Sequence, residues 1–197
     1  PVFMPNNLRE ASLYAYYSGK AGVTLYNRPE KKSQYELWGY EDSLQGKEVL
    51  LVTKYPFPAS REAATNLRTV HYRNIPFFRS FYTGIAIDPL SVQQTADSIF
   101  VRFAISNQRD YPLQFTSGPN GETASLVYLL EKDKKTVQTD IMQPLTAADS
   151  IPPGGSVEWI VHIAKKDFSA GKYTLLFGIR YGGLPDAWLS KPEVFEK

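Results

Sequence analysis

The chain has 197 residues, of which 43% are hydrophobic and 21% charged, a composition typical of a folded protein rather than a disordered one. Its formal net charge of +2 is too small to indicate a protein that binds nucleic acid. The absence of cysteine excludes a disulfide scaffold, thiolate metal sites and a cysteine nucleophile, and it fits either a reducing cytosol or a bacterial periplasm.

The N-terminal segment begins with a short apolar strand over residues 1–5, followed by a helix over residues 8–18. Asn7 and Glu10 have the spacing of a capping box, and Gly19 can adopt the left-handed conformation that ends a helix. We expect one face of this helix to pack inward. That face carries Leu8, Ala11, Ser12 and Ala15.

Two further strands and one more helix follow in this region. Val23–Tyr26 is a short strand, and the continuous apolar run Val49–Thr53 is typical of a strand buried on both faces of a parallel sheet. Ser60 can cap a short helix that extends to Leu67. The alternation of strands and helices predicts an α/β domain over residues 1–78.

From residue 79 onward the helical periodicity disappears and strand patterns take over. Turn-forming runs such as Gly118–Gly121 and Pro152–Gly155 separate these strands. The arrangement predicts an all-β sandwich over residues 79–197. The expected strands are 84–87, 98–105, 124–130, 157–163 and 173–179.

Tyr173 opens the last of these strands just after Gly171, as in the tyrosine corner of immunoglobulin-like sandwiches. There the phenol hydroxyl bonds to upstream backbone, so we expect a structural role. In the strand 157–163, alternation puts Trp159 and Val161 on the inward face and His162 on the outward one. We therefore predict an immunoglobulin-like sandwich with His162 exposed.

No pattern in the sequence indicates catalysis. There is no phosphate-binding glycine loop and no nucleophile elbow, and His71 and His162 lack partners at metal-ligand spacing. The carboxylates Glu36, Glu41 and Asp42 cluster, but we expect them to be solvated, as such side chains mostly are. We predict no catalytic residue, no metal site and no cofactor.

The best candidate for a binding surface is the loop from residue 27 to residue 38. Arginine and lysine can hold phosphate or acidic sugar oxygens, while tyrosine and tryptophan can stack on sugar rings. The alternative is that the two aromatic residues anchor the loop to the sheet. The candidate binding residues are Arg28, Lys32, Gln34, Tyr35 and Trp38, with Lys31 beside them.

The order of motifs over the first third of the chain resembles a known family. Asn6–Gly19, then a short strand, then Ser33-Gln34-Tyr35-x-x-Trp38, then Gly46-Lys47 and an apolar strand, looks like the C-terminal soluble region of bacterial polyprenyl-phosphate-sugar glycosyltransferases. These include relatives of dolichyl-phosphate-mannose–protein mannosyltransferases and the aminoarabinose transferases that act on lipid A.

The resemblance implies a non-catalytic, extracytoplasmic portion of a membrane enzyme, at the periplasmic face of the cytoplasmic membrane. It would shape the acceptor side of the active site or dock partners: the parent's membrane domain, a glycan, a lipid-linked sugar or a protein acceptor. The family's catalytic carboxylate lies in the membrane domain, so no catalytic residue carries over. The family's arginine before Ser-Gln-Tyr is Lys32 here, which keeps the charge but loses the bidentate fork.

Two other functions stay open. Aromatic richness fits a stand-alone carbohydrate-binding or adhesion module, and a hydrolase is disfavoured because nucleophile and base motifs are missing. No run approaches the roughly 20 apolar residues that span a bilayer. Because the chain begins at Pro1, we expect it to be a fragment of a longer protein.

Overall fold

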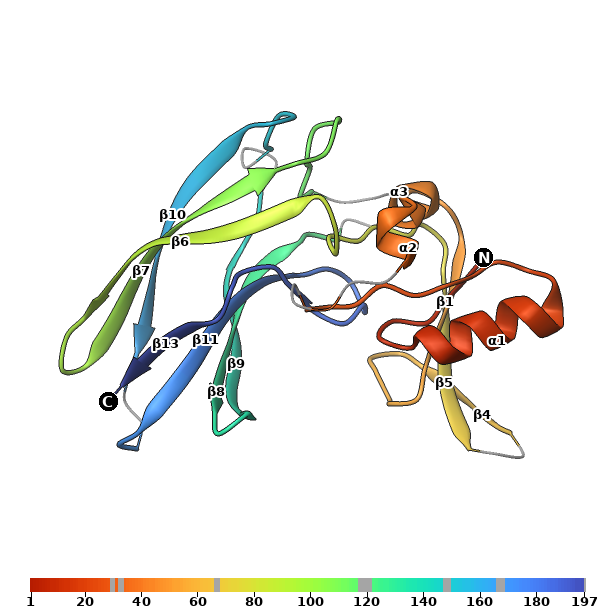
Figure 1. Cartoon of the computed structure of the whole chain (residues 1–197), viewed down its shortest axis with the longest axis horizontal. Coiled ribbons are helices and arrows are strands. Elements are labelled where there is room, and N and C mark those ends of the chain that lie inside the picture. The colour runs from red at the N-terminus through yellow and green to blue at the C-terminus, as the bar shows by residue number, and fades with distance from the viewer. Residues whose placement is uncertain are drawn as a thin grey trace.

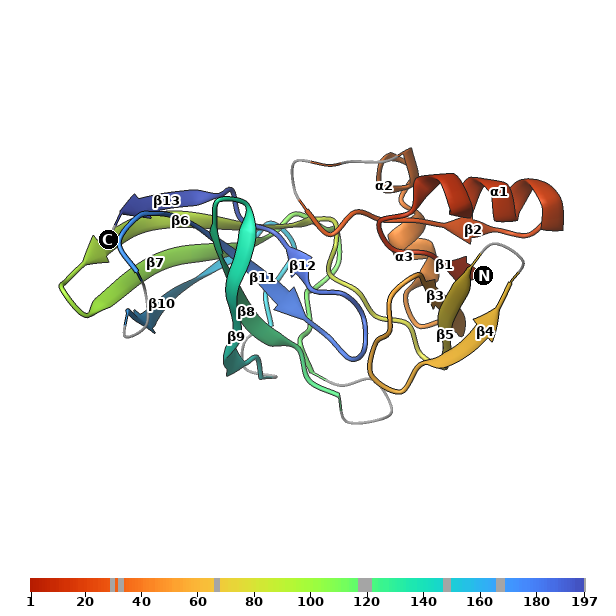
Figure 2. The ribbon, with the colours of Figure 1, turned by 90° about the horizontal axis from the view of Figure 1, so that it is seen from below.

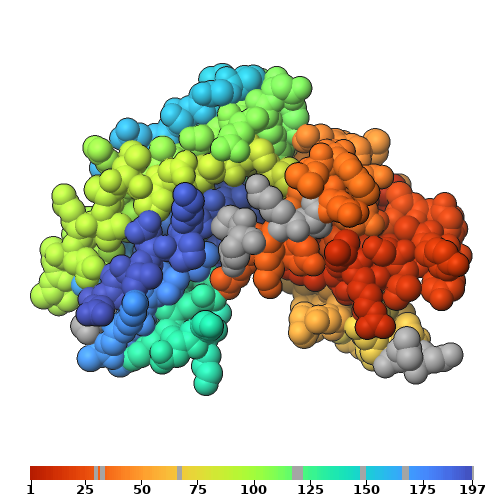
Figure 3. Space-filling model, viewed as in Figure 1, coloured from red at the N-terminus to blue at the C-terminus, as the bar shows by residue number. Residues whose placement is uncertain are grey.

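A computed structural model of the chain describes residues 1–28, 31, 34–65, 68–116, 122–146, 150–165 and 169–196. These residues form a mostly β fold with three sheets and three helices (Figure 1). The first sheet and the helices lie at one end of an elongated molecule, and the other two sheets lie at the opposite end. The outline of the molecule is indented between the two ends (Figure 3).

The first sheet is mixed and has the strand order β2-β1-β3-β5-β4. β1 pairs in parallel with both β2 and β3, whereas β5 runs antiparallel to β3 and to β4. Its strands are β1 (Val2–Phe3), β2 (Gly22–Val23), β3 (Val49–Thr53), β4 (Arg61–Ala64) and β5 (Thr69–Ile75).

Helix α1 (Leu8–Ser18) connects β1 to β2 and has the predicted ends. The Asn7 side chain accepts the N–H of Glu10 at 3.4 Å, and Gly19 ends the helix with φ 64°. The helix lies along β2 (Figure 2). A Cβ at Gly22 would lie 2.4 Å from the carbonyl oxygen of Ala11, so only glycine allows this approach.

The inward face predicted for α1 is confirmed only in part. Ala11 is fully buried and Ala15 is half-buried, but Leu8 is 39% exposed and Ser12 is also exposed. Because the two strands beneath the helix are only two residues long, they cover only a narrow strip of its surface.

Two predictions for the rest of the sheet also need correction. β3 is half-exposed rather than buried on both faces, because its neighbour β5 is antiparallel and Leu50 points outward. The helix predicted over residues 60–67 is wrong, since Arg61–Ala64 forms strand β4. Pairing with β5 through a turn closed by Thr65 and Arg68 overrides a weak local helical preference. Residues 66–67 lie outside the described part.

The second and third sheets contain the five strands predicted after residue 79 and three that the sequence did not reveal. The second has the order β10-β7-β6, with β6 (Ile85–Gln94), β7 (Ser98–Asn107) and β10 (Ser156–Ala164). The third has the order β12-β11-β8-β9, with β13 also paired to β11. Its strands are β8 (Ser125–Lys132), β9 (Lys135–Pro144), β11 (Lys172–Arg180), β12 (Ala187–Trp188) and β13 (Glu193–Glu196).

The two sheets pack against each other through alternating apolar residues. Ile99, Val101, Phe103 and Ile105 of β7 are fully buried, and the ring of Phe103 stacks on that of Phe177 from β11 with centroids 4.9 Å apart. The strand β9 was missed because it is polar and mostly exposed at the edge of its sheet.

Two single-residue predictions in these sheets are confirmed. The Tyr173 hydroxyl donates to the carbonyl oxygen of Ser169 at 2.7 Å, the upstream backbone bond expected of a tyrosine corner. His162 is exposed, stacks on Phe100 with ring centroids 4.9 Å apart, and lies 2.7 Å from the Ser98 hydroxyl through its Nε2.

Side chains from both ends of the molecule contribute to one apolar cluster. Phe3 packs edge-on against Phe78 at 5.2 Å between centroids, and Phe81 continues the cluster to Phe115 at 5.8 Å. The boundary between residues 78 and 79 stays a prediction. The segment around it is nevertheless part of a continuous core.

Candidate functional site

The predicted binding loop contains two short helices that present an apolar surface. Gln34–Leu37 forms α2, and Tyr40–Leu44 forms α3. Leu37 is 78% exposed and Trp38 is 63% exposed. Tyr35 and Tyr40 are partly buried against the core, and their rings contact Trp38 at 6.2 and 6.1 Å between centroids. We call Tyr35, Leu37, Trp38 and Tyr40 the α2 patch.

The other predicted binding residues do not converge on the α2 patch. The Arg28 guanidinium forms an ion pair with Glu131 of β8 at 2.5 Å, where both side chains are largely buried. Gln34 is exposed at the start of α2. Lys32 lies outside the described residues. Arg28 and Leu37 do share the lining of a cavity of about 490 Å³ between α2 and β12.

Beside the patch, Glu41 is a correction to the expectation that the clustered carboxylates are solvated. Glu41 of α3 is fully buried and forms an ion pair with Arg109 at 3.3 Å. Its carboxylate also accepts the backbone N–H groups of Tyr82 and Thr83, at 2.8 and 2.6 Å, and the Ser80 hydroxyl at 2.6 Å. A buried carboxylate with this many donors holds the fold together.

The Arg109 side chain is the central partner of Glu41, and we call Glu41, Arg109 and the residues bonded to them the Glu41 cluster. Its guanidinium also donates to the carbonyl oxygen of Thr83 at 2.8 Å and to the Tyr111 hydroxyl at 2.8 Å. The cluster therefore joins α3, the segment that follows residue 79, and the loop after β7. Sequence reasoning missed it because the partners of Glu41 are about 40 to 70 residues away.

The two remaining carboxylates also have structural partners. Glu36 accepts the backbone N–H of Tyr26 at 3.0 Å, and Asp42 accepts the Tyr111 hydroxyl at 2.5 Å. The pKa of Tyr111 is raised to about 12, mainly by burial and to a smaller extent by this hydrogen bond to Asp42. The nearby charge of Arg109 opposes the shift. Of the three carboxylates, Glu41 is buried, Glu36 is half-buried and Asp42 is exposed, so the predicted solvation holds only for Asp42.

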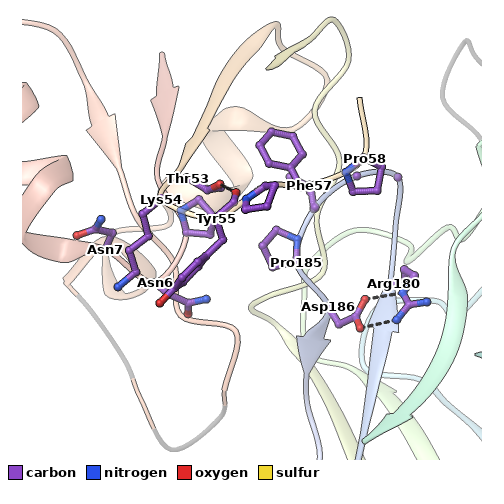
Figure 4. Close-up of a pocket in the computed structure, with 15 residues that line it drawn as sticks. Asn6, Asn7, Thr53, Lys54, Tyr55, Phe57, Pro58, Arg180, Pro185 and Asp186 are labelled. Atoms are coloured by element: carbon purple, nitrogen blue, oxygen red, sulfur yellow. Dashed lines mark hydrogen bonds and ion pairs between the residues drawn. The ribbon is translucent and has the colours of Figure 1, made fainter. Parts of the chain in front are cut away.

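A second concave surface, which the sequence analysis did not reveal, lies where the first sheet meets the loop after β11 (Figure 4). Its volume is about 630 Å³, within the range of small-molecule sites. Two walls come from segments that follow the carboxyl ends of the parallel strands β1 and β3, the usual place for ligands in open sheets with parallel strands. The lining of this junction pocket is Pro5–Asn7, residues 53–58, Arg180 and residues 182–186.

Within the described residues, no group of three or more histidine, aspartate or glutamate side chains is placed to hold a metal ion. In the same part of the chain, every helix is too short or too polar to cross a membrane.

Comparison with known proteins identifies no family. No family model matches the chain, and no curated protein matches it. Among solved structures, a β-glucosidase from Kluyveromyces marxianus is similar with a TM-score of 0.40 and 17% identity, covering 63% of this chain and 16% of that one. An alkylpurine DNA glycosylase, AlkC, from Pseudomonas fluorescens has a TM-score of 0.35 and 9% identity, covering 57% of this chain and 30% of that one.

A third structure, β-glucosidase 3B from Thermotoga neapolitana, has a TM-score of 0.31 and 18% identity, and covers 59% of this chain and 17% of that one. This chain thus spans less than a third of the length of each of these proteins. Likenesses this weak carry no information about its function.

Proposed function

We propose that the chain is the non-catalytic, extracytoplasmic C-terminal portion of a membrane glycosyltransferase that uses a polyprenyl-phosphate sugar. The observation that carries this proposal is the α2 patch. The motif that resembles the transferase family, Gln34-Tyr35-x-x-Trp38, ends in two large apolar side chains exposed to solvent. Contiguous exposed apolar residues commonly mark a surface that contacts another protein or a membrane.

In this proposal the α2 patch contacts the membrane domain of the parent protein, at the periplasmic face of the cytoplasmic membrane. Tyr35 and Tyr40 hold the patch against the core, while Leu37 and Trp38 form the contact. The chain then shapes the side of the active site where a glycan, a lipid-linked sugar or a protein acceptor binds. It supplies no reacting group.

The finer fold assignment is part of the same proposal. An α/β unit is supported by β1, α1 and β2, a parallel strand pair joined by a crossover helix. An immunoglobulin-like sandwich is supported by the packed sheets and by the hydrogen bond from Tyr173 to the backbone of Ser169. An isolated parallel bridge between Ile87 of β6 and Ser190, just after β12, also connects the two sheets.

The test uses the full-length protein that contains this chain, in membrane vesicles. We expect the variant with Leu37→Ser and Trp38→Ser to lose most transfer of sugar from a polyprenyl-phosphate donor, with unchanged expression. Ile160→Ser is the matched control, because Ile160 is 70% exposed on β10, away from the patch. Full activity of the patch variant, or a native polypeptide without hydrophobic spans before Pro1, would overturn the proposal.

A stand-alone carbohydrate-binding module is the second candidate, because the Trp38 indole is exposed and could stack on a sugar. Glycan-array binding that disappears in Trp38→Ala and Tyr35→Ala would support it. Absence of binding to every glycan on the array would count against it.

A further inference from the structure

The junction pocket is walled on one side by a loop that is held in place before any ligand arrives. The Asp186 carboxylate pairs with the Arg180 guanidinium through two bonds of 2.7 and 2.8 Å. The Tyr82 hydroxyl donates to the carbonyl oxygen of Pro185 at 2.6 Å. A Cβ at Gly183 would lie 2.5 Å from the Arg73 guanidinium, so this loop also lies tightly against β5. The wall is thus preorganised, which lowers the entropic cost of binding.

The opposite wall includes two exposed residues, Lys54 and Tyr55. Tyr55 is 67% exposed, and the Lys54 ammonium lies 5.1 Å from the centre of its ring. Figure 4 shows both side chains extending in the same direction, toward Asn6. Among the described residues, no carboxylate forms an ion pair with Lys54. The pocket therefore offers an aromatic face beside a cation.

Polar groups at the two ends of the pocket are suited to hydroxyl groups. Asn6 accepts the backbone N–H of Asn27 at 2.9 Å through Oδ1, which leaves its amide N–H₂ to donate. Each oxygen of the Asp186 carboxylate accepts one bond from Arg180 and keeps further lone pairs. In Figure 4 the ring of Pro185 lies between them, and Phe57 adds an apolar side chain to the lining.

The charged residues that line the pocket leave one cation in excess. The charged residues of the lining itself are Lys54, Arg180 and Asp186. Behind the walls, Arg73 lies beside Gly183, Glu122 lies beside Gly182, and Asp140 acts on Arg180. Since Arg180 and Asp186 neutralise each other, the Lys54 ammonium is the group that faces the cavity with its charge available.

We propose that the junction pocket binds an acidic pyranose, a sugar ring that carries a carboxylate. The ring lies against Tyr55, the carboxylate meets Lys54, and the ring hydroxyls bond to Asn6 and Asp186. This site is separate from the α2 patch, and the proposal uses nothing of the proposed transferase function. Binding of an acidic pyranose at the junction pocket is therefore expected even if the chain belongs to another class of protein.

The test is a titration of the ¹⁵N-labelled 197-residue chain with sodium glucuronate, followed by NMR. We expect a dissociation constant of about 1 mM, with shifts concentrated at residues 6–7, 53–58 and 182–186. Lys54→Gln should weaken binding about tenfold, as expected for the loss of a charge-assisted bond. Tyr55→Ala should abolish the shifts. Tyr16→Ala, at an 81% exposed tyrosine on α1, is the matched control and should bind normally.

Two comparison probes separate the parts of the proposal. Methyl glucoside should bind at least about tenfold more weakly than glucuronate, because it lacks the carboxylate. Inorganic phosphate should also bind more weakly, because it lacks the ring that stacks on Tyr55. Equal binding of either probe, unchanged binding by Lys54→Gln, or no localised shifts with glucuronate would overturn the assignment.

Discussion

Trp38 of the α2 patch and Glu41 are three residues apart in the chain, yet their surroundings differ in burial and in charge. Leu37 and Trp38 are apolar and mostly exposed, whereas Glu41 is charged and fully buried. An exposed apolar pair contributes little to the fold and is available to a partner. A buried carboxylate that accepts four hydrogen bonds and an ion pair is already fully used. Burial therefore distinguishes residues that are available to bind a partner from residues that stabilise the fold, and the type of residue does not.

The largest effect is expected for Glu41→Ala. Removing the carboxylate leaves the Arg109 charge and several buried donors without partners, so the free energy of unfolding should fall by about 3–5 kcal/mol. Urea denaturation measures this loss. Asp42→Ala is the matched control, because Asp42 is exposed, and its loss should be below about 1 kcal/mol. Similar losses of unfolding free energy in the two variants would show that Glu41 stabilises the fold no more than an exposed carboxylate does.

The same region should also lose stability at alkaline pH. In the folded chain the pKa of the Tyr111 phenol is about 12, whereas the ordinary pKa of tyrosine is 10.0. Since the folded state binds the proton more tightly, its contribution is complete below pH 10 and is lost as the pH rises from 10 toward 12. Burial also raises the pKa of Tyr82, with Glu41 and Asp186 adding to the shift.

Urea midpoints of the native chain and of Tyr111→Phe, measured at a series of pH values, test this. The native chain should become progressively less stable relative to the variant above pH 10, because only the native chain carries the titrating phenol. A difference that stays constant with pH would show that Tyr111 titrates as in the unfolded chain.

A smaller effect is expected for Arg28, which the sequence analysis placed among the binding residues. Its ion pair with Glu131 joins the segment before α2 to β8. Arg28→Ala should lower the free energy of unfolding by about 1 kcal/mol, because the pair is partly screened by solvent. A double-mutant cycle with Glu131→Ala should give a coupling energy of about 0.5 kcal/mol or more. A coupling energy of zero would mean that the ion pair does not stabilise the fold, and Arg28 would again be a candidate binding residue.

The smallest change in stability is expected at the α2 patch itself. Replacing Leu37 and Trp38 together by serine should change the free energy of unfolding by no more than about 0.5 kcal/mol, because both side chains are mostly exposed. Urea denaturation of the isolated chain checks this. A loss above about 1 kcal/mol would mean that the patch is part of the core, and the comparison with Glu41 would fail.

The sequence by itself determined the features that depend on neighbouring residues. The ends of α1 follow from Asn7 and Gly19, and the strands of the two packed sheets follow from runs such as Ser98–Ile105. The Tyr173 hydrogen bond spans only four residues, so its motif was recognisable. In each case the determining interactions are local or repeat at a fixed period.

Only the tertiary structure decided which polar groups are buried and what lies beside them. Glu41 meets partners up to 68 residues away, Arg28 meets Glu131 103 residues away, and the junction pocket combines three distant segments. Residues 61–64 became a strand because β5 was available to pair with them. Such contacts depend on how the sheets come together, and no spacing along the chain encodes that arrangement.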